Sequence, residues 1–342
     1  MRTSDFDYDL PAEYIAQTPL EQRDLSRLLI LDRHTGDFRH AIFRDIGNYL
    51  RQGDILVLNE TRVIPARLFA RKVPSGGKVE ILLLRKRDEH TWEALVGGKG
   101  LTVGKQLKVS ALVPEDKTPT GEIIEDLSGS ERLIQFDQEL EPFFSIIGHV
   151  PLPPYIHTTL QDPERYQTVY ANNPGSAAAP TAGLHFTPEL ITQLIGKGIQ
   201  FTNVTLHVGM DTFAPVNEGN PKEHRMHTEW CQLMPETAEV INQASKEGGR
   251  VIAVGTTSVR TLESAAANGK LTAFEGPTDL FILPGYKFQV VDGLITNFHL
   301  PRSTLIMMVS ALAGRENILN AYEVAKQANY RFYSFGDAML II

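Results

Sequence analysis

The middle of the chain consists of short strand-like runs with no helix between them, and this segment most constrains the fold. Turn sequences such as Pro-Ser-Gly-Gly, Asp-Glu-His and Gly-Gly-Lys-Gly separate six β-rich runs. The runs are 63–72, 78–87, 91–96, 106–110, 122–127 and 133–136. Short strands at this spacing are typical of a small barrel or sandwich. We predict a small all-β barrel domain over residues 62–150, ending near the linker Pro151-Leu-Pro-Pro154.

The sequence on either side of this segment alternates between strand and helix patterns. We expect helices beginning after Thr187 and over 235–246, 258–268 and 317–328, and strands over 201–208, 250–254 and 331–335. Asp292-Gly293 between two apolar runs, 288–291 and 294–298, predicts a β-hairpin. Alternating strands and helices with one hairpin indicate an α/β domain with a mixed sheet. The barrel is therefore predicted to be inserted into a discontinuous α/β domain made of residues 1–61 and 151–342.

The charge of the chain is unevenly distributed. The net charge of −8 argues against indiscriminate nucleic-acid binding, yet residues 61–113 hold 11 Lys/Arg and only 4 Asp/Glu. Residues 114–145 hold 2 basic and 9 acidic residues. Such an asymmetry indicates either a polyanion partner on one local face or two halves of a domain that pair electrostatically. The counts leave both interpretations open.

Cysteine usage and hydropathy narrow the class of protein. A single cysteine, Cys231, excludes an internal disulfide and a cysteine-rich metal cluster. No run approaches the roughly 20 apolar residues that span a bilayer, and the acidic N-terminal sequence lacks the apolar stretch of a secretory signal. We expect a soluble, cytoplasmic protein with no membrane partner.

Three turns place hydroxyl and histidine side chains beside predicted helices. They are Ala179–Phe186 with Thr181 and His185, Val254–Arg260 with Thr256, Thr257 and Arg260, and Ile295–Met308 with Asn297, His299, Arg302, Ser303 and Thr304. Ligands of α/β sheets tend to lie beyond the carboxyl ends of strands, where such turns gather. Any one turn could be ordinary helix capping, but the three together favour a shared pocket.

Two further segments carry candidate binding residues. His207 ends a predicted strand, and the segment Glu223–Glu229 contains His224, Arg225 and His227. Because the two histidines have no third ligand at a known spacing, we predict no metal and favour contact with an anionic substrate or pairing within the segment. Arg62 and Arg67 lie where the chain enters the barrel, so they could meet phosphates or form a polar hinge.

Six segments together resemble a known enzyme family. They are Asp5–Pro11, Gly53–Arg62, Ala178–Phe186, Gly255–Arg260, Asn297–Thr304 and Tyr333–Met339. In this combination the chain resembles the S-adenosylmethionine:tRNA ribosyltransferase-isomerase family of queuosine biosynthesis over nearly its whole length. One departure is Gly209-Met-Asp-Thr-Phe213, where the family pattern is Gly-Leu-Gly-Thr-Phe, and this leaves the role of Asp211 open.

The resemblance implies an unusual use of S-adenosylmethionine, which is consumed as a substrate with no added cofactor. Its ribosyl part, rather than its methyl group, is transferred to 7-aminomethyl-7-deazaguanine (preQ1) at the wobble position of a tRNA anticodon. The product is epoxyqueuosine in the tRNA, with adenine and methionine released. The partners are therefore S-adenosylmethionine and tRNA carrying preQ1, and we expect the chain to act as a monomer.

Such a reaction needs a base next to the sulfonium and an acid for the departing adenine, and histidine serves either role near neutral pH. We predict His185 and His299 as catalytic residues, with His207 third, and Phe186 and Phe298 against the sulfonium or the bases. The predicted substrate-binding residues are Thr181, Thr256, Thr257, Arg260, Asn297, Arg302, Ser303 and Thr304, and the predicted tRNA-binding residues are Arg62, Arg67 and Arg225. The alternatives are a non-catalytic RNA-binding protein, a metal-dependent hydrolase at His224 and His227, and an ordinary methyltransferase.

Overall fold

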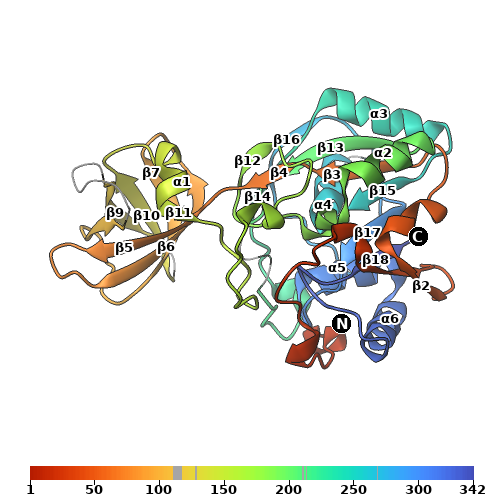
Figure 1. Cartoon of the computed structure of the whole chain (residues 1–342), viewed down its shortest axis with the longest axis horizontal. Helices are drawn as coiled ribbons and strands as arrows, with labels where there is room; N and C mark the ends of the chain where they lie inside the picture. Colours follow the sequence, from red (N-terminus) through yellow and green to blue (C-terminus); the bar gives the residue numbers. More distant parts are fainter. Residues whose placement is uncertain (111–117, 128, 210–211, 213, 268) are drawn as a thin grey trace. The chain divides into compact units, whose positions relative to one another are not determined.

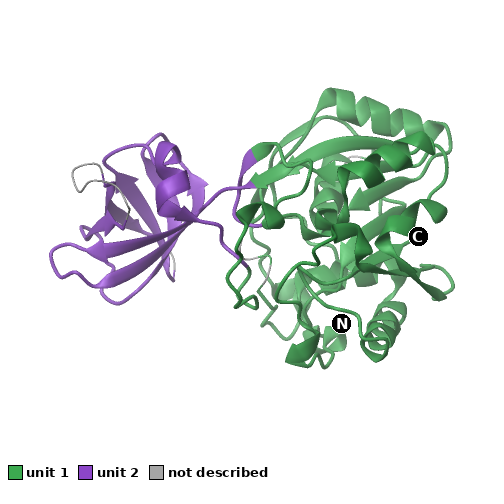
Figure 2. Cartoon of the chain, viewed as in Figure 1, with its two compact units in different colours: residues 1–62, 153–173, 179–342 green, residues 63–152, 174–178 purple. Residues whose placement is uncertain are grey.

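The computed structural model describes residues 1–342 except 111–117, 128, 210–211, 213 and 268. The chain divides into two compact units, shown in Figure 2. The larger unit contains residues 1–62, 153–173 and 179–342, and the smaller contains 63–152 and 174–178. Where the chain passes between the units, β4 (Thr61–Val63) and β12 (Asn173–Ser176) form a two-stranded ribbon.

The described part of the larger unit is built on one mixed sheet of nine strands (Figure 1). In spatial order the strands are β16 (Phe274–Thr278), β14 (Glu229–Leu233), β13 (Gln200–Leu206), β3 (Ile55–Asn59), β15 (Val251–Val254), β17 (Gly293–Asn297), β18 (Ala338–Ile341), β1 (Arg27–Leu31) and β2 (Phe38–Ile42). The four central strands β13, β3, β15 and β17 are mutually parallel. The remaining neighbours pair antiparallel, except β1 with β18. The predicted mixed sheet is therefore confirmed.

Alternate residues of the central strands enter two separate hydrophobic cores. Along β3, Ile55 and Val57 belong to one cluster and Leu56 and Leu58 to the other. Because successive side chains of a strand point to opposite faces, this division shows that both faces of the sheet are buried. The first cluster also contains buried residues of α3 (Pro235–Lys246), α4 (Thr256–Ala265), α5 (Thr304–Ala313) and α6 (Arg315–Gln327), and the second those of α2 (Pro188–Gly196).

The smaller unit is a closed antiparallel barrel, as predicted. Its six described strands follow the order β5 (Arg67–Lys72), β6 (Lys78–Lys86), β7 (Thr91–Gly97), β10 (Glu131–Phe136), β9 (Thr120–Asp126) and β8 (Gln106–Val109), and β8 pairs with β5 to close the ring. The two-residue strand β11 (Gly148–His149), which follows α1 (Phe144–Ile147), also pairs with β5. Gly121 is required by packing, because a Cβ there would lie 2.8 Å from the side chains of Ile134 and Phe136.

Two predicted strands of the larger unit are wrong. Residues 288–291 form no strand and hence no hairpin with β17, because the amides of Gln289, Val290 and Val291 donate to the carboxylate of Glu263 on α4 instead. Residues 331–335 form a turn in which Tyr333 has a φ of 69°, a left-handed value that no regular strand contains. The strand in this part of the chain is β18, which begins at Ala338.

The parallel strands β3 and β15 are joined at their amino ends by a buried carboxylate. Asp54 accepts hydrogen bonds from the Arg250 side chain at 3.1 and 2.6 Å, from the Arg250 amide at 3.1 Å and from the Arg51 amide at 2.7 Å. Burial disfavours its ionisation, but the bonds from Arg250 and Arg51 outweigh burial and lower the pKa of the Asp54 carboxyl. The carboxylate therefore stays charged and holds the two strands in register.

We predict that Asp54→Ala lowers the free energy of unfolding by about 3 kcal/mol, because it leaves the Arg250 guanidinium without its carboxylate. Urea unfolding measures the change. The control is Asp24→Ala, which removes the 3.3 Å ion pair with the partly exposed Arg44 and should cost less than about 1 kcal/mol. Equal losses in the two variants would contradict the role given to Asp54.

Candidate active site

A cavity of the larger unit lies at the edge where β3, β13, β15 and β17 end. Parallel strands bring their carboxyl ends to the same edge, where ligand sites of α/β sheets are found. The cavity holds about 510 Å³ of empty space, including the part open to solvent. Its described lining residues are Tyr155, Ala179, Pro180, Thr181, Ala182, Val208, Thr212, Gly255, Thr256, Thr257, Thr296, Asn297, Phe298, His299, Leu300, Leu305, Tyr333 and Ser334. No Asp, Glu, Lys or Arg is among them.

The buried side chain of Asn59, the last residue of β3, fixes three elements at this edge. Its Oδ1 accepts from the amides of Leu206 (3.0 Å) and Thr61 (3.2 Å). Its Nδ2 donates to the Leu206 carbonyl (3.0 Å) and to Thr257 Oγ1 (3.1 Å). All four hydrogen-bonding positions of the amide are thus used. Because Thr257 Oγ1 accepts from Asn59, its own proton is left to donate into the cavity.

The amino end of α4 opens onto the cavity. Gly255 precedes the helix with a φ of 87°, a left-handed value that suits glycine. No side chain caps this end, so the first-turn amides, with the hydroxyls of Thr256 and Thr257, are available to a ligand. This arrangement suits an anionic or hydroxyl-bearing group.

A chain of hydrogen bonds runs from the cavity wall to His185. Thr181 Oγ1 donates to Asn297 Oδ1 at 2.9 Å, and Asn297 Nδ2 contacts His185 Nε2 at 3.4 Å. His185 Nδ1 in turn lies 2.8 Å from Ser26 Oγ, and the imidazole lies against the Phe43 ring with centroids 5.0 Å apart. Thr181 and Asn297 line the cavity, whereas His185 does not. His185 therefore contacts a residue of the cavity wall without lining this cavity itself.

His299 lies in the cavity wall itself. Its Nε2 is 2.7 Å from Thr296 Oγ1, while Nδ1 has no partner within the described part of the chain. The Tyr322 hydroxyl accepts from the His299 amide at 2.9 Å, and the Tyr8 hydroxyl donates to its carbonyl. Burial lowers the pKa of the His299 imidazole to about 3, so the ring is neutral and able to accept a proton at physiological pH.

Five polar residues of the wall are missing from the predicted site: Tyr155, Thr212, Thr296, Tyr333 and Ser334. The Tyr155 and Tyr333 rings lie 4.6 Å apart, and the Tyr155 hydroxyl is 2.8 Å from Ser334 Oγ. Tyr333 and Ser334 belong to the segment Tyr333–Met339 that carries the family resemblance, which was the available signal. Tyr155 follows the proline-rich linker with no local signal of a site.

Arg260, predicted as a substrate-binding residue, is not among the described residues that line this cavity. Its side chain is buried and pairs with the carboxylate of Glu229, and it also donates to the carbonyls of Thr278 (3.1 Å) and Leu280 (3.2 Å). Burial opposes ionisation of Glu229, but the His227 hydrogen bond and the Arg260 charge outweigh it and lower its pKa. Glu229 Oε1 then accepts from Thr212 Oγ1 at 3.0 Å, so the ion pair holds a wall residue in place.

Four other predicted site residues also lie outside the cavity lining. Ser303 is fully buried and caps α5, accepting from the Ile306 amide at 3.3 Å. Thr304 is the buried first residue of α5, and Arg302 lies half-exposed 3.6 Å from the carboxylate of Asp7. His207 bonds to Thr61 Oγ1 at 2.8 Å and stacks on Trp230, and burial lowers the pKa of its imidazole. Of the predicted aromatic residues, Phe298 lines the cavity and Phe186 packs in a core cluster.

The remaining candidates concern metal and RNA. Among the residues that the structure describes, no group of three or more His, Cys, Asp or Glu could hold a metal ion. His224 pairs with Glu218 at 2.9 Å, and His227 lies 3.4 Å from Glu229. Of the predicted RNA contacts, Arg225 is exposed, whereas Arg62 pairs with Glu164 and Arg67 with Glu80. Asp211 lies outside the described residues.

Comparisons with known proteins show the family of this chain. A family model described as queuosine biosynthesis protein matches residues 3–341. The chain belongs to this family. It is 55% identical, over all of both chains, to an S-adenosylmethionine:tRNA ribosyltransferase-isomerase of Carboxydothermus hydrogenoformans, and 54% identical, again over all of both chains, to one of Caldanaerobacter subterraneus.

A solved structure resembles the chain as well. It is a crystal structure of an S-adenosylmethionine tRNA ribosyltransferase from Thermotoga maritima, 40% identical, with a TM-score of 0.57. The match covers 99% of this chain and 100% of that one. No helix among the described residues of the present family member has the length and apolar character needed to cross a membrane.

Burial lowers the pKa of His185 to about 4, below the value of about 6.5 in an unfolded chain. Between these values the unfolded chain binds the extra proton, so the stabilisation is complete above pH 6.5 and is lost as the pH falls toward 4. We predict that wild-type protein loses about 3 kcal/mol through this residue over that window, whereas His185→Gln lacks this loss.

Urea unfolding at several pH values measures the effect, with His34→Gln at an exposed turn as the control. An unchanged pH slope in His185→Gln would contradict the predicted titration.

Proposed function

We propose that the cavity at the strand ends binds S-adenosylmethionine and transfers its ribosyl part to preQ1 in the tRNA anticodon. The enzyme is an S-adenosylmethionine:tRNA ribosyltransferase-isomerase of queuosine biosynthesis. The observation that carries the assignment of this site is the gathering of His299, Asn297, Thr181 and Thr257 around one cavity. These side chains come from three turns that are far apart in the sequence.

The cavity wall suits a sulfonium nucleoside. The rings of Tyr155, Phe298 and Tyr333 lie in the wall, and aromatic faces attract cationic groups. Thr257 presents a proton to the cavity because its oxygen accepts from Asn59, and Thr181 presents a free lone pair because its proton is given to Asn297. A donor and an acceptor at fixed positions can hold ribose hydroxyls or the adenine edge, and the first-turn amides of α4 can take the methionine carboxylate.

The first chemical step is removal of a proton from the ribose carbon beside the sulfonium, whose positive charge acidifies that carbon. We assign this step to His299, whose Nδ1 has no partner among the described residues. If Nε2–H donates to Thr296 Oγ1, Nδ1 carries the lone pair that accepts the proton. The electron pair left on that carbon forms a double bond to the next ribose carbon, whose bond to the ring oxygen breaks; the ring oxygen then forms a carbonyl and expels adenine, which takes up the proton. The neutral preQ1 amine adds to the vinyl sulfonium at the carbon beside the sulfonium-bearing one and loses a proton, and the sulfonium-bearing carbon attacks the carbonyl to close the carbon ring. The alkoxide formed there displaces methionine from the neighbouring carbon and gives the epoxide.

Other wall residues position the reactants. The Tyr333 hydroxyl stays protonated because burial raises its pKa, so it can donate a hydrogen bond to the departing adenine. Asn297, oriented by His185, presents a fixed amide to the nucleoside. The preQ1 amine must be neutral to attack, and a cavity with no charged side chain in its described wall favours the neutral form.

Recognition of the tRNA would use the basic surface of the barrel together with Arg225. In the barrel unit, Lys86 of the basic segment 61–113 pairs with Glu141 of the acidic segment 114–145. Arg67 and Arg87 instead pair with carboxylates within the basic segment. The excess of 11 Lys/Arg over 4 Asp/Glu in residues 61–113 supports a polyanion partner for this segment.

Incubation of the protein with S-adenosylmethionine and an anticodon stem-loop carrying preQ1 tests the function. We expect adenine, methionine and an RNA heavier by one epoxycyclopentanediol group, detected by mass spectrometry. Release of S-adenosylhomocysteine with a methylated RNA would instead indicate a methyltransferase. RNA binding without consumption of S-adenosylmethionine would indicate a binding protein.

We predict that His299→Ala lowers kcat at least about a hundredfold, because the base is lost. The KM for S-adenosylmethionine should change by less than about fivefold if the wall residues of the other turns do the binding. Steady-state kinetics of the folded variant measure both constants, with exposed His34→Ala as the control. Nearly normal turnover in His299→Ala would remove this residue from the mechanism.

A further inference from the structure

A second cavity adjoins the first in the larger unit. Ser334 lines both cavities, and His185 and Ser26 line the second. The second cavity holds about 300 Å³ of empty space, including the part open to solvent. Its wall also contains two arginines, Arg23 and Arg165, so it differs from the first cavity in carrying charge.

Backbone carbonyls hold the two arginines in place. Arg23 donates to the carbonyls of Gln167 (2.6 Å) and Glu164 (2.9 Å), and Arg165 donates to those of Glu21 (3.0 Å) and Leu20. Each guanidinium has five N–H groups, so three on each side chain remain for other partners. The carbonyl bonds therefore hold both arginine side chains in place and leave N–H groups of each available to a ligand.

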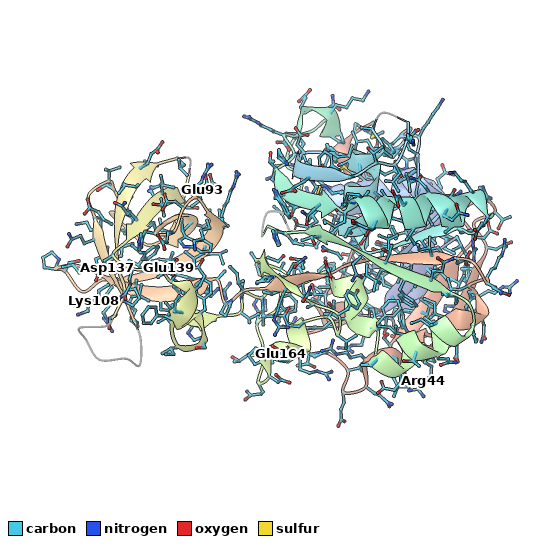
Figure 3. The ribbon with its side chains drawn as sticks, turned by 90° about the horizontal axis from the view of Figure 1, so that it is seen from above. Arg44, Glu93, Lys108, Asp137, Glu139 and Glu164 are labelled. Atoms are coloured by element: carbon cyan, nitrogen blue, oxygen red, sulfur yellow. The ribbon has the colours of Figure 1, made fainter. Side chains whose placement is uncertain are left out.

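The positive charge at this cavity is not neutralised by an ion pair. Neither Arg23 nor Arg165 lies within 4.0 Å of a carboxylate among the described residues, and the nearby Glu164, labelled in Figure 3, pairs with Arg62 instead. Burial first, and then the charge of Arg165, lower the pKa of Arg23, while the more distant charges of Asp162 and Glu164 partly offset this by raising it. The two positive charges repel each other beside a partly buried cavity, and a bound anion would offset this repulsion.

The second cavity is connected to the first by hydrogen bonds. Ser26 in its wall contacts His185 Nδ1, and His185 Nε2 contacts Asn297 in the wall of the first cavity. A ligand that bonds to Ser26 would therefore act on the orientation of the Asn297 amide. A ligand in the second cavity can therefore affect the first cavity, as expected if one substrate complex occupies both.

We propose that the second cavity binds a backbone phosphate of the RNA substrate through Arg23 and Arg165, beside the nucleotide that enters the first cavity. The guanidinium fork matches the oxygen geometry of a phosphate. The S-adenosylmethionine carboxylate is the other oxyanion of the reaction, and the open amides of α4 already offer it a place. The inference rests on the proposed function, because that function supplies an RNA.

The test measures binding of a preQ1 anticodon stem-loop by the full chain, without S-adenosylmethionine, at several salt concentrations. Arg23→Gln and Arg165→Gln should each raise the Kd at low salt about tenfold. The slope of log affinity against log salt should fall by about 0.7 to 1 in each variant, since one phosphate contact is weakened. The KM for S-adenosylmethionine should stay within twofold of wild type.

Two controls separate charge from structure. Arg165→Lys loses the carbonyl bonds but keeps the charge, so it should retain most of the salt slope. Arg44→Gln, at the half-exposed arginine labelled in Figure 3, should leave both Kd and slope unchanged.

Two outcomes would overturn the proposal. An unchanged salt slope in both glutamine variants would show that the arginines only hold the loops. A raised KM for S-adenosylmethionine with unchanged RNA binding would assign the cavity to that substrate's carboxylate. Because RNA binding needs no turnover, these outcomes are distinct from failure of the wild-type protein to form the modified RNA.

Discussion

The site depends on the amide of Asn59, which ties the ends of two strands to the start of a helix. Four parallel strands finish at one edge of the sheet, and each end would otherwise leave backbone groups without partners. Asn59 satisfies both the amide and the carbonyl of Leu206 and also holds Thr257. Because Thr257 Oγ1 accepts a hydrogen bond from this amide, the hydroxyl of Thr257 acts toward a ligand as a donor. A bond that stabilises the fold thus also sets the hydrogen-bonding character of the cavity wall.

A second buried group holds another residue of the wall, Thr212, in place. The Glu229–Arg260 pair lies behind the cavity, where its charges are matched by carbonyls, by Thr212 and by the Gly209 amide at 2.8 Å. A buried ion pair stabilises little by itself, because desolvation offsets the attraction. The role of this ion pair is to hold Thr212 in position, and neither of its charged side chains belongs to the described cavity wall.

The sequence predicted the architecture well because architecture follows from repeating patterns. Short β-rich runs between turn sequences indicated the barrel strands, alternating strand and helix patterns indicated the α/β unit, and turns beside predicted helices indicated a pocket. It could not separate Ser303 from Thr257, because a hydroxyl at a helix start either caps the helix or faces a ligand. Nor could it show that Arg260 pairs with Glu229, which lies 31 residues earlier in the chain. The predicted hairpin at Asp292 failed for the same reason, since the amides of Gln289 and Val290 bond to Glu263, a residue of α4 that is distant in the sequence.

The lack of charge in the described cavity wall follows from the reaction that we propose. A sulfonium acidifies the neighbouring carbon only while its positive charge is not neutralised. A carboxylate against the sulfur would stabilise the bound substrate more than the transition state, in which negative charge develops on that carbon, and so would slow proton removal. Aromatic rings bind the cation more weakly and are polarisable, and a neutral imidazole adds no charge until it accepts the proton. The burial that lowers the pKa of His299 therefore weakens the base but preserves the acidity of the substrate. The sulfonium therefore activates the ribose carbon, and the main contribution of the enzyme is to position the reactants.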